Sequence, residues 1–384
     1  MMKDEKVEPI RVLHVLYVMN YAGTETLLMS IYRNTDRSRI QFDFAVCSDQ
    51  SGDYDKEIVD LGGRIIKYPK YTVTNHLSYK KWWEDFFRNH KEYRIVHGHI
   101  GSTAALYLSV AKQSGCYTIA HSHATNNIKF NLKDLVYSVY SYRTRFIADF
   151  FFGCSMAALK DRYGARIAKN TNRSRVFLNA IDVDRFIFDQ ETRNRVRKEF
   201  GISQDEIVFG TVGRLTASKN PYLILNILLE LKNRGRDFLF LWFGRGELED
   251  QIRAKINEMG LEDNIIMGGV RNDINRILQA MDAFVFPSVF EGLGITCVEA
   301  QAADLVCFCS SNIPQEARIT ERFIALPIDD TDAWINSIQS FLNAGKRKRA
   351  NRSEEIKKAG YDINSQSNWL TDFYIDINED KLCQ

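Results

Sequence analysis

Apolar and amphipathic segments alternate along the first half of the chain. Short runs rich in Val and Ile predict buried strands, and the segments between them repeat apolar residues with a helical period. The expected strands are residues 11–18, 41–47, 64–67, 94–97 and 117–121, and the expected helices are 24–33, 54–61, 79–90 and 103–114. This order predicts a doubly wound parallel sheet, a fold in which ligands gather at the carboxyl ends of the strands.

The same alternation begins again after a charged, helical segment at residues 189–200. Further strands are expected at residues 207–212, 238–243, 264–267, 283–286 and 305–309, and helical patterns recur up to residue 377. We therefore predict an α/β protein with two domains, residues 1–187 and 188–365, followed by a last helix within residues 366–384.

The composition is that of an ordinary globular protein, with 45% hydrophobic and 26% charged residues. A formal net charge of +2 gives no reason to expect nucleic acid as a partner. Seven cysteines, an odd number lying mostly within apolar patterns, are expected to be buried thiols of a reducing compartment. The first residues are charged and lack the apolar core of a signal peptide, which predicts a cytoplasmic protein.

A loop with two acidic residues and two glycines follows the strand expected at residues 283–286. Glu291 lies in the loop, and Glu299 lies about one turn into a helix that is expected to start near Ile295. Glycines let the backbone approach a ligand closely, and the free N–H groups of a helix start favour an anion or hydroxyl oxygens. The pattern suits a polyhydroxylated, phosphorylated ligand, although a solvated loop acid and a helix-dipole partner would also explain it.

Two more strand ends in the second half join glycine to basic residues. Gly213 and Arg214 follow one strand, and Lys219 precedes a helix that is expected to start at Pro221. A guanidinium and an ammonium at such a place suit a diphosphate, although basic loop residues are commonly only solvated. The turn Gly244–Gly246 repeats the arrangement, without the third glycine of a dinucleotide-binding motif.

Four of the seven histidines end two strands of the first half. His97 and His99 end one strand, and His121 and His123 end another, so that alternation puts each pair on one face. Satisfied structural histidines and ligand-binding histidines both remain open. No metal is expected, because no Asp or Cys lies beside either pair. The loop after the first strand offers Gly23, as either a ligand contact or a plain helix-opening turn.

Together these motifs resemble those of the retaining glycosyltransferases of family 4. Residues 287–300, Pro-Ser-Val-Phe-Glu-Gly-Leu-Gly-Ile-Thr-Cys-Val-Glu-Ala, are similar to the family's E-x7-E signature. Gly213-Arg-Leu with Lys219, Gly244-Arg-Gly246, the loop around Gly23 and the strand end at His121 are similar to further family motifs. They occur in the expected order between residues 10 and 375, with Ala22 and Ala180 where the family usually has glycine.

The resemblance implies the GT-B fold, in which two Rossmann-like doubly wound domains face each other across a cleft. It also implies that the last helix returns to the first domain. The implied reaction is metal-independent sugar transfer with retention, from a nucleotide-sugar co-substrate and without another cofactor.

The resemblance also assigns roles to individual residues. Arg214 and Lys219 would neutralise the leaving diphosphate, Glu299 would hold the ribose, and Glu291 and His121 would lie beside the donor sugar. The other implied substrate contacts are the backbone of Gly292, Leu293, Gly294 and Ile295 for the sugar, Gly213, Gly244 and Gly246 for the nucleotide, Val270 and Arg271 for the base, Gly23 for donor phosphate or acceptor, and His123 as the alternative to His121.

Similarity to bacterial capsule and exopolysaccharide transferases implies a UDP-hexose donor and a glycan or lipid-linked acceptor. Residues 125–169 are rich in aromatic and basic side chains. Peripheral contact with the inner face of the membrane would produce this pattern, and so would a solvated helix packed by its tyrosines. Two other functions stay open: a sugar-nucleotide epimerase of the same two-domain architecture, and a non-catalytic nucleotide-sugar-binding protein.

Overall fold

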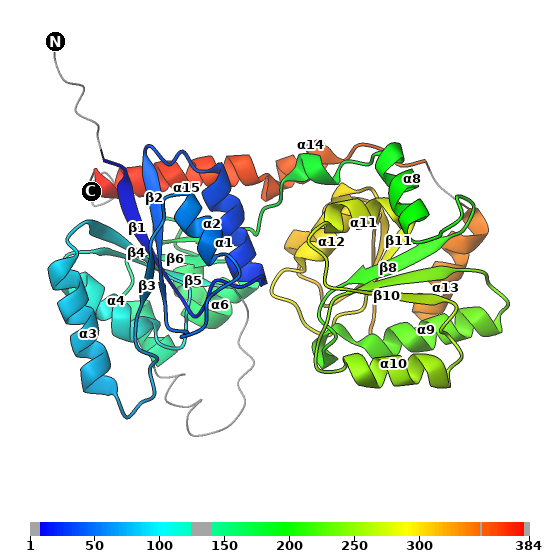
Figure 1. Ribbon diagram of the computed structural model, residues 1–384, viewed down its shortest axis with the longest axis horizontal. Coiled ribbons are helices and arrows are strands. Elements are labelled where there is room, and N and C mark those ends of the chain that lie inside the picture. Colours follow the sequence, from blue (N-terminus) through cyan, green and yellow to red (C-terminus); the bar gives the residue numbers. More distant parts are fainter. Residues whose placement is uncertain (1–7, 124–139, 346–347, 380–384) are drawn as a thin grey trace, which may run out of the picture. The chain divides into compact units, whose positions relative to one another are not determined.

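The structure, a computed structural model, describes residues 8–123, 140–345 and 348–379. The chain divides into two compact units, which Figure 1 shows with their helices and strands. Unit 1 takes the chain up to Ile181 and again from Ile363, and unit 2 runs from Asp182 to Asp362. The boundaries expected at residues 187 and 365 lie a few residues further along the chain.

Within the described ranges, unit 1 contains one parallel sheet of seven strands in the order β3-β2-β1-β4-β5-β6-β7. The strands are β1 Ile10–Leu16, β2 Ile40–Val46, β3 Ile65–Lys67, β4 Tyr93–Gly98, β5 Tyr117–Ser122, β6 Phe150–Gly153 and β7 Ser174–Val176. The helices are α1 Gly23–Asn34, α2 Asp55–Asp60, α3 His76–Asn89, α4 Ala104–Gln113, α6 Met156–Tyr163, α7 Ala165–Ala168 and α15 Ile363–Asn378, with a 3-10 turn at Thr144–Phe146.

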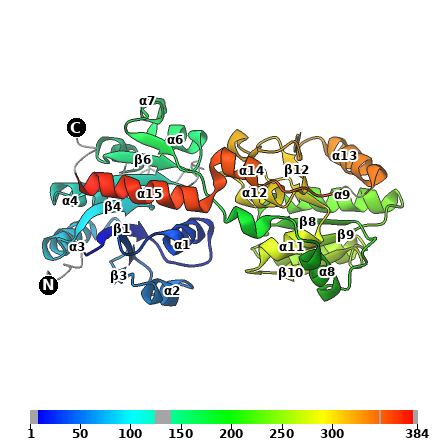
Figure 2. The ribbon, with the colours of Figure 1, turned by 90° about the horizontal axis from the view of Figure 1, so that it is seen from above.

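Each face of this sheet packs against helices and forms its own core. The core on one face contains side chains of α1, α2 and α15. The other core contains side chains of α3, α4 and α6. Helix α15 comes from the end of the described chain, lies along unit 1 beside α1 (Figure 2), and buries Leu370, Phe373 and Tyr374.

Unit 2, as far as the structure describes it, has a parallel sheet of six strands in the order β10-β9-β8-β11-β12-β13. The strands are β8 Val208–Val212, β9 Leu239–Phe243, β10 Ile265–Gly269, β11 Ala283–Phe286, β12 Val306–Ser310 and β13 Phe323–Leu326. The helices are α8 Gln190–Glu199, α9 Pro221–Asn233, α10 Glu249–Glu258, α11 Ile274–Ala280, α12 Ile295–Ala302, α13 Thr331–Ala344 and α14 Ser353–Ile356, with short turns at η2 Val183–Phe186, η3 Ala217–Lys219, η4 Gln315–Ala317 and η5 Lys357–Tyr361.

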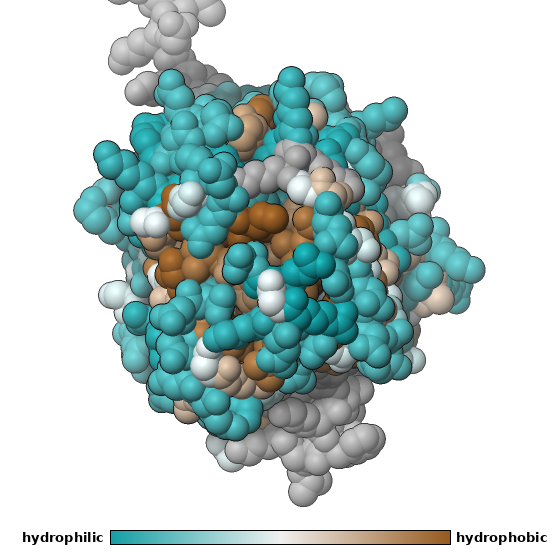
Figure 3. Space-filling view, turned by 90° about the vertical axis from the view of Figure 1, so that its right-hand side faces the viewer, coloured by the Kyte–Doolittle hydropathy of each residue, from teal (hydrophilic) through white to brown (hydrophobic). Residues whose placement is uncertain are grey.

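The predicted fold class, α/β with two doubly wound parallel sheets, is confirmed. The six described cysteines are free thiols, and five of them are buried. None of the described helices combines the length and the apolar character needed to cross a membrane. Figure 3 shows a face of unit 2 on which hydrophilic side chains predominate and hydrophobic ones gather in one central area.

Candidate functional site in unit 2

Backbone hydrogen bonds join the loops that follow β8, β9 and β10 at the carboxyl edge of the sheet in unit 2. The N–H of Gly213 donates to the carbonyl oxygen of Phe243 at 2.9 Å, and the N–H of Gly244 donates to that of Gly269 at 2.8 Å. The N–H of Leu215 donates to the carbonyl oxygen of Arg245 at 3.1 Å. The backbone on both sides of Arg214 is therefore held by the neighbouring loop.

Gly244 and Gly246 allow this close approach of two loops. The backbone of Gly244 has a φ of +128°, and a Cβ there would lie 1.9 Å from the carbonyl oxygen of Gly213. A Cβ at Gly246 would lie 2.3 Å from the carbonyl oxygen of Leu215. Packing between loops thus requires both glycines, and their predicted contact with a nucleotide stays a prediction.

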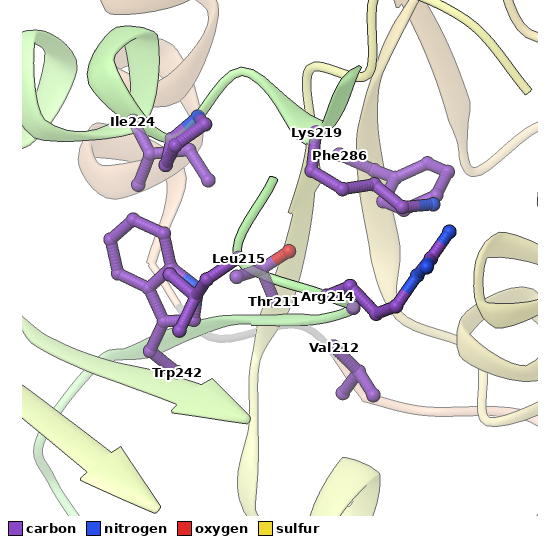
Figure 4. A pocket seen from close by; sticks show the side chains of 10 residues that line it. Thr211, Val212, Arg214, Leu215, Lys219, Ile224, Trp242 and Phe286 are labelled. Atoms are coloured by element: carbon purple, nitrogen blue, oxygen red, sulfur yellow. The ribbon is translucent and has the colours of Figure 1, made fainter. Parts of the chain in front are cut away.

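Arg214 and Lys219 line a pocket next to these loops. In Figure 4 the charged ends of both side chains point to the same region beside the ring of Phe286. Asn220 takes a left-handed conformation and Pro221 begins α9, so the chain turns sharply after Lys219. The pocket is lined by Thr211, Val212, Gly213, Arg214, Leu215, Lys219, Pro221, Ile224, Trp242 and Phe286.

The two cations differ in what they contact. Lys219 is half-buried, forms an ion pair with the carboxylate of Glu291, and has its Nζ 5.0 Å from the centre of the Phe286 ring. Arg214 is exposed, and its side chain forms no hydrogen bond or ion pair with any other residue that the structure describes. One cation is thus fixed by the protein, and the other is available to a ligand.

The loop between β11 and α12 positions Glu291. Its Val289 N–H donates to the carbonyl oxygen of Ser218 at 2.8 Å, which ties it to the loop of Lys219. Leu293 is buried, and Gly294 starts α12 in a left-handed conformation, with φ +84° and ψ +52°. The structure therefore brings Glu291 together with Lys219, while the predicted backbone contacts of Gly292 and Ile295 with a sugar stay predictions.

Glu299 lies on α12 in a different charge environment. Desolvation by burial raises its pKa to about 7, and the charge of Arg185 on η2 partly opposes this shift. No ion pair or hydrogen bond within the described ranges links the Glu299 carboxylate to Arg214, Lys219 or Glu291. Its predicted role toward ribose hydroxyls remains a prediction.

Val270 and Arg271 follow β10. Val270 is 65% exposed. The guanidinium of Arg271 pairs with Asp273 at 2.8 Å and with Glu199 at 3.0 Å, and these hydrogen bonds raise its pKa. Acidic groups of unit 2 therefore already hold Arg271, and its proposed position beside the base stays a prediction.

The other predicted residues lie in unit 1. Gly23 is the first residue of α1, and a Cβ there would meet nothing within 4 Å. His121 lies near the end of β5 and His123 directly follows this strand, with the two ring centres 3.9 Å apart. Burial lowers the pKa of His121 well below its usual value and that of His123 to about 3, so both imidazoles are neutral at neutral pH. Their predicted contact with a sugar stays a prediction.

Sequence reasoning missed two features of these sites. Phe286, the last residue of β11, lies under the Lys219 ammonium, although in the sequence it reads only as the end of a buried strand. His14 on β1 also lies beside the predicted histidines, with its ring centre 5.3 Å from those of His97 and His99. The signal in the sequence that could have identified it was a histidine inside an apolar strand.

Two doubly wound α/β units, one with two basic residues and an acidic loop at the carboxyl edge of its sheet, are the architecture expected of a glycosyltransferase of the GT-B type. The chain belongs to the group 1 glycosyltransferases, whose family model, "Glycosyl transferases group 1", matches residues 192–360. The predicted membership of the family 4 type and the predicted enzyme class, glycosyltransferase, are thereby confirmed.

Relatives extend the similarity over nearly the whole chain. "Putative glycosyltransferase EpsF" of Bacillus subtilis (strain 168) is 30% identical over 375 residues, which cover 95% of this chain and 96% of that protein. The Escherichia coli "UDP-Gal:alpha-D-GlcNAc-diphosphoundecaprenol alpha-1,3-galactosyltransferase" is 24% identical, over 96% of this chain and 97% of its own. The solved structure of HepE from Anabaena in complex with UDP has a TM-score of 0.76 at 15% identity, over 95% of this chain and 100% of that one, and supports the fold.

Proposed function

We propose that this chain is a retaining, metal-independent hexosyltransferase. It moves a sugar from a UDP-hexose donor to a glycan or lipid-linked acceptor in the biosynthesis of a capsular or extracellular polysaccharide. The observation that carries the proposal is that Arg214 and Lys219 line one pocket on the carboxyl edge of the sheet in unit 2, with Glu291 paired to Lys219. This edge is where doubly wound folds bind nucleotides.

The two cations suit the chemistry of a departing nucleoside diphosphate. As the sugar–phosphate bond breaks, negative charge grows on the diphosphate oxygens, and cations fixed in advance lower the free energy of that transition state. The unpaired guanidinium of Arg214 can donate two hydrogen bonds to one phosphate. Lys219 adds a second charge at a fixed place. In this proposal they do the work that a divalent cation does in metal-dependent transferases.

Glu291 has two roles in the proposal. One carboxylate oxygen holds the ammonium of Lys219, and the other remains able to accept a hydrogen bond from a hydroxyl of the donor sugar. We assign retention to a same-face displacement in which the leaving phosphate takes the proton of the acceptor hydroxyl. This assignment needs no side-chain nucleophile.

The relatives support the proposed substrates. The Escherichia coli relative is named for transfer from UDP-Gal to a sugar on diphosphoundecaprenol, and the HepE structure contains UDP. In this proposal the enzyme works in the cytoplasm, at the inner face of the membrane, where it would meet a lipid-linked acceptor. Part of the aromatic and basic stretch 125–169 lies outside the described residues, but its described part exposes Tyr142 (55%) and Phe146 (74%). Exposed rings beside arginines suit peripheral contact with anionic lipid.

A thermal-shift screen followed by product analysis tests this function. A UDP-sugar at about 100 times its dissociation constant should stabilise the folded chain by about 2.7 kcal/mol, and GDP- or ADP-sugars should stabilise it less. With acceptor and no added divalent metal, the product should keep the anomeric configuration of the donor in its NMR spectrum. Epimerised donor formed without acceptor would identify an epimerase, and donor that binds but is never consumed would identify a binding protein.

A further inference from the structure

Five histidines of unit 1 meet at the carboxyl edge of its sheet. His14 lies on β1, opposite His97 of β4 in the strand register, and His99 follows β4. His121 and His123 lie at the end of the adjacent β5. Neighbouring rings have their centres between 3.9 Å, for His121 with His123, and 5.4 Å, for His99 with His121. Three strands thus bring together side chains that the sequence shows only as separate pairs.

Hydrogen bonds connect part of this histidine cluster. Nδ1 of His14 lies 3.1 Å from Nε2 of His99, and Nδ1 of His99 lies 2.8 Å from Nε2 of His123. Nδ1 of His97 lies 2.7 Å from the hydroxyl oxygen of Tyr374 on α15. Both nitrogens of His99 are therefore engaged, which fixes the orientation of its ring.

The other nitrogens of the cluster are buried without a partner among the described residues. They are Nε2 of His14, Nε2 of His97, Nδ1 of His123, and both ring nitrogens of His121. A buried polar atom left without a partner destabilises the fold. The cluster has five such nitrogens in one place, and they are available to a ligand that imidazole nitrogens recognise.

The surroundings of the cluster narrow the class of ligand. Aromatic rings of Phe42, Phe44, Phe152 and Phe177 pack against it. The atoms that the cluster offers to a ligand are imidazole nitrogens. Imidazole nitrogen is a donor that Zn²⁺, Co²⁺, Ni²⁺ and Cu²⁺ accept, whereas Mg²⁺ and Ca²⁺ prefer oxygen.

We propose that His99, His121 and His123 bind one divalent transition-metal ion of the zinc class. One nitrogen of each residue lies within 4.8 Å of one nitrogen of the other two. Ligands at about 2.0–2.1 Å around a tetrahedral ion lie about 3.3 Å apart, so small ring movements would complete the site. His14, which contacts the far nitrogen of His99, is the outer partner that orients this ligand.

A second set, His14, His97 and His99, also has the required spacing. Its His14 and His97 are almost completely buried, at 0% and 1% exposure, and give an ion no entry path. His99 and His123 are partly exposed at the ends of their strands, so the outer set is the one an ion can reach. With three protein ligands, the fourth position stays open to water or a hydroxyl oxygen.

This site uses His121 and His123, for which the family resemblance predicts a sugar contact, but it takes no part in neutralising the diphosphate. The proposed transfer is metal-independent because Arg214 and Lys219 of unit 2, and not a metal ion, are proposed to neutralise the diphosphate. The sequence alone gave no reason to expect a metal, because it showed two isolated pairs without supporting Asp or Cys. The contact of His99 with His123 and the position of His14 change that expectation.

Cobalt and zinc binding to the full chain without a polyhistidine tag tests the site. After dialysis against a chelator, the wild-type chain should bind about one Co²⁺ with the strong visible absorption of a tetrahedral ion. His121→Ala and His99→Ala should lower the affinity at least about 10–100-fold. His90→Ala, which changes a half-exposed histidine on the surface, should bind Co²⁺ like the wild type. Stoichiometric binding that survives both cluster variants would overturn the proposal, and so would no binding by the wild type at micromolar Co²⁺.

X-ray absorption of the zinc-loaded wild-type chain gives a result without any mutation. The zinc scattering should show about three imidazole ligands at about 2.0–2.1 Å. One imidazole or none would overturn the site even if a histidine variant failed to fold. Because neither measurement uses sugar transfer, failure of this proposal and failure of the proposed function are distinguishable.

Discussion

The ammonium of Lys219 and the carboxylate of Glu291 form an ion pair across 72 positions of the sequence. Lys219 follows β8 and Glu291 follows β11, two strands that pair in the sheet of unit 2. The side chains are 23% and 12% exposed, so water screens the pair only in part. The pair therefore fixes one charge of the proposed donor pocket before any ligand arrives.

A double-mutant cycle should detect this pair. Lys219→Met should lower the free energy of unfolding by about 1–3 kcal/mol, because it leaves a half-buried carboxylate without its partner. Adding Glu291→Gln should recover part of that loss, with a coupling energy within about 0.5–3 kcal/mol. Urea unfolding of the four proteins measures it. The control is the exposed pair Arg33–Glu57, 41% and 38% exposed, for which we expect less than about 1 kcal/mol. Equal coupling in both cycles would contradict the prediction.

Arg214→Ala should separate activity from stability. Turnover should fall on the order of 100-fold or more, because a cation that stabilises the leaving diphosphate is lost. Unfolding in urea should be unchanged, because the exposed Arg214 side chain forms no ion pair within the described chain. Arg253→Ala, which breaks a surface pair with Glu249 on α10, is the matched control and should keep normal turnover. Near-normal turnover of Arg214→Ala would remove its assigned role.

Gly244→Ala should destabilise unit 2. The new methyl group would lie 1.9 Å from the carbonyl oxygen of Gly213, on a backbone whose φ of +128° also disfavours side chains. We expect a loss of at least about 1–3 kcal/mol in urea unfolding. Gly23→Ala in unit 1 is the control, since its methyl group would meet nothing within 4 Å and should change stability little. Unfolding curves that are alike for the two variants would show that the loops do not pack as described.

Glu299 should make stability depend on pH. Its pKa is about 7 in the folded chain against 4.5 for an ordinary glutamate, because burial disfavours the charged form. The folded state therefore binds a proton more tightly than the unfolded state, and the free energy of unfolding falls as pH rises from 4.5 to about 7. Glu299→Gln should remove this fall, so that the variant is the more stable protein at about pH 8 and nearly equal to the wild type at pH 4.5. The same pH slope in both proteins would contradict the prediction.

The alternation of apolar and amphipathic segments was enough to predict the fold, but not every strand. β6 consists of Phe150–Gly153 and is followed closely by the apolar face of α6, so one apolar run spans a strand and a helix start without a clear period. β13 lies at the edge of its sheet, and most of its residues are partly exposed, which weakens the apolar signal. Local pattern identifies buried strands better than short or edge strands.

The sequence proposed residues for the candidate site but could not predict the contacts between them. Resemblance to a family singled out Arg214, Lys219 and Glu291, and the structure shows that two of them bind each other. No sequence pattern reports an ion pair across 72 positions. The glycines of the loop after β9, Gly244 and Gly246, also show that a sequence pattern does not identify the partner of a contact. The sequence indicated close approach at Gly244, but only the coordinates identify the neighbouring backbone as the group that approaches.

Helix α15 has a consequence for how the protein is made. Unit 2 is a continuous stretch, whereas one face of the sheet in unit 1 is covered by a helix that starts at Ile363. During translation, the ribosome completes unit 2 before it releases the helix that closes the unit begun first. Nascent unit 1 therefore exposes the apolar surface that Leu370 and Phe373 will cover, and this intermediate is the one for which chaperones would compete with aggregation.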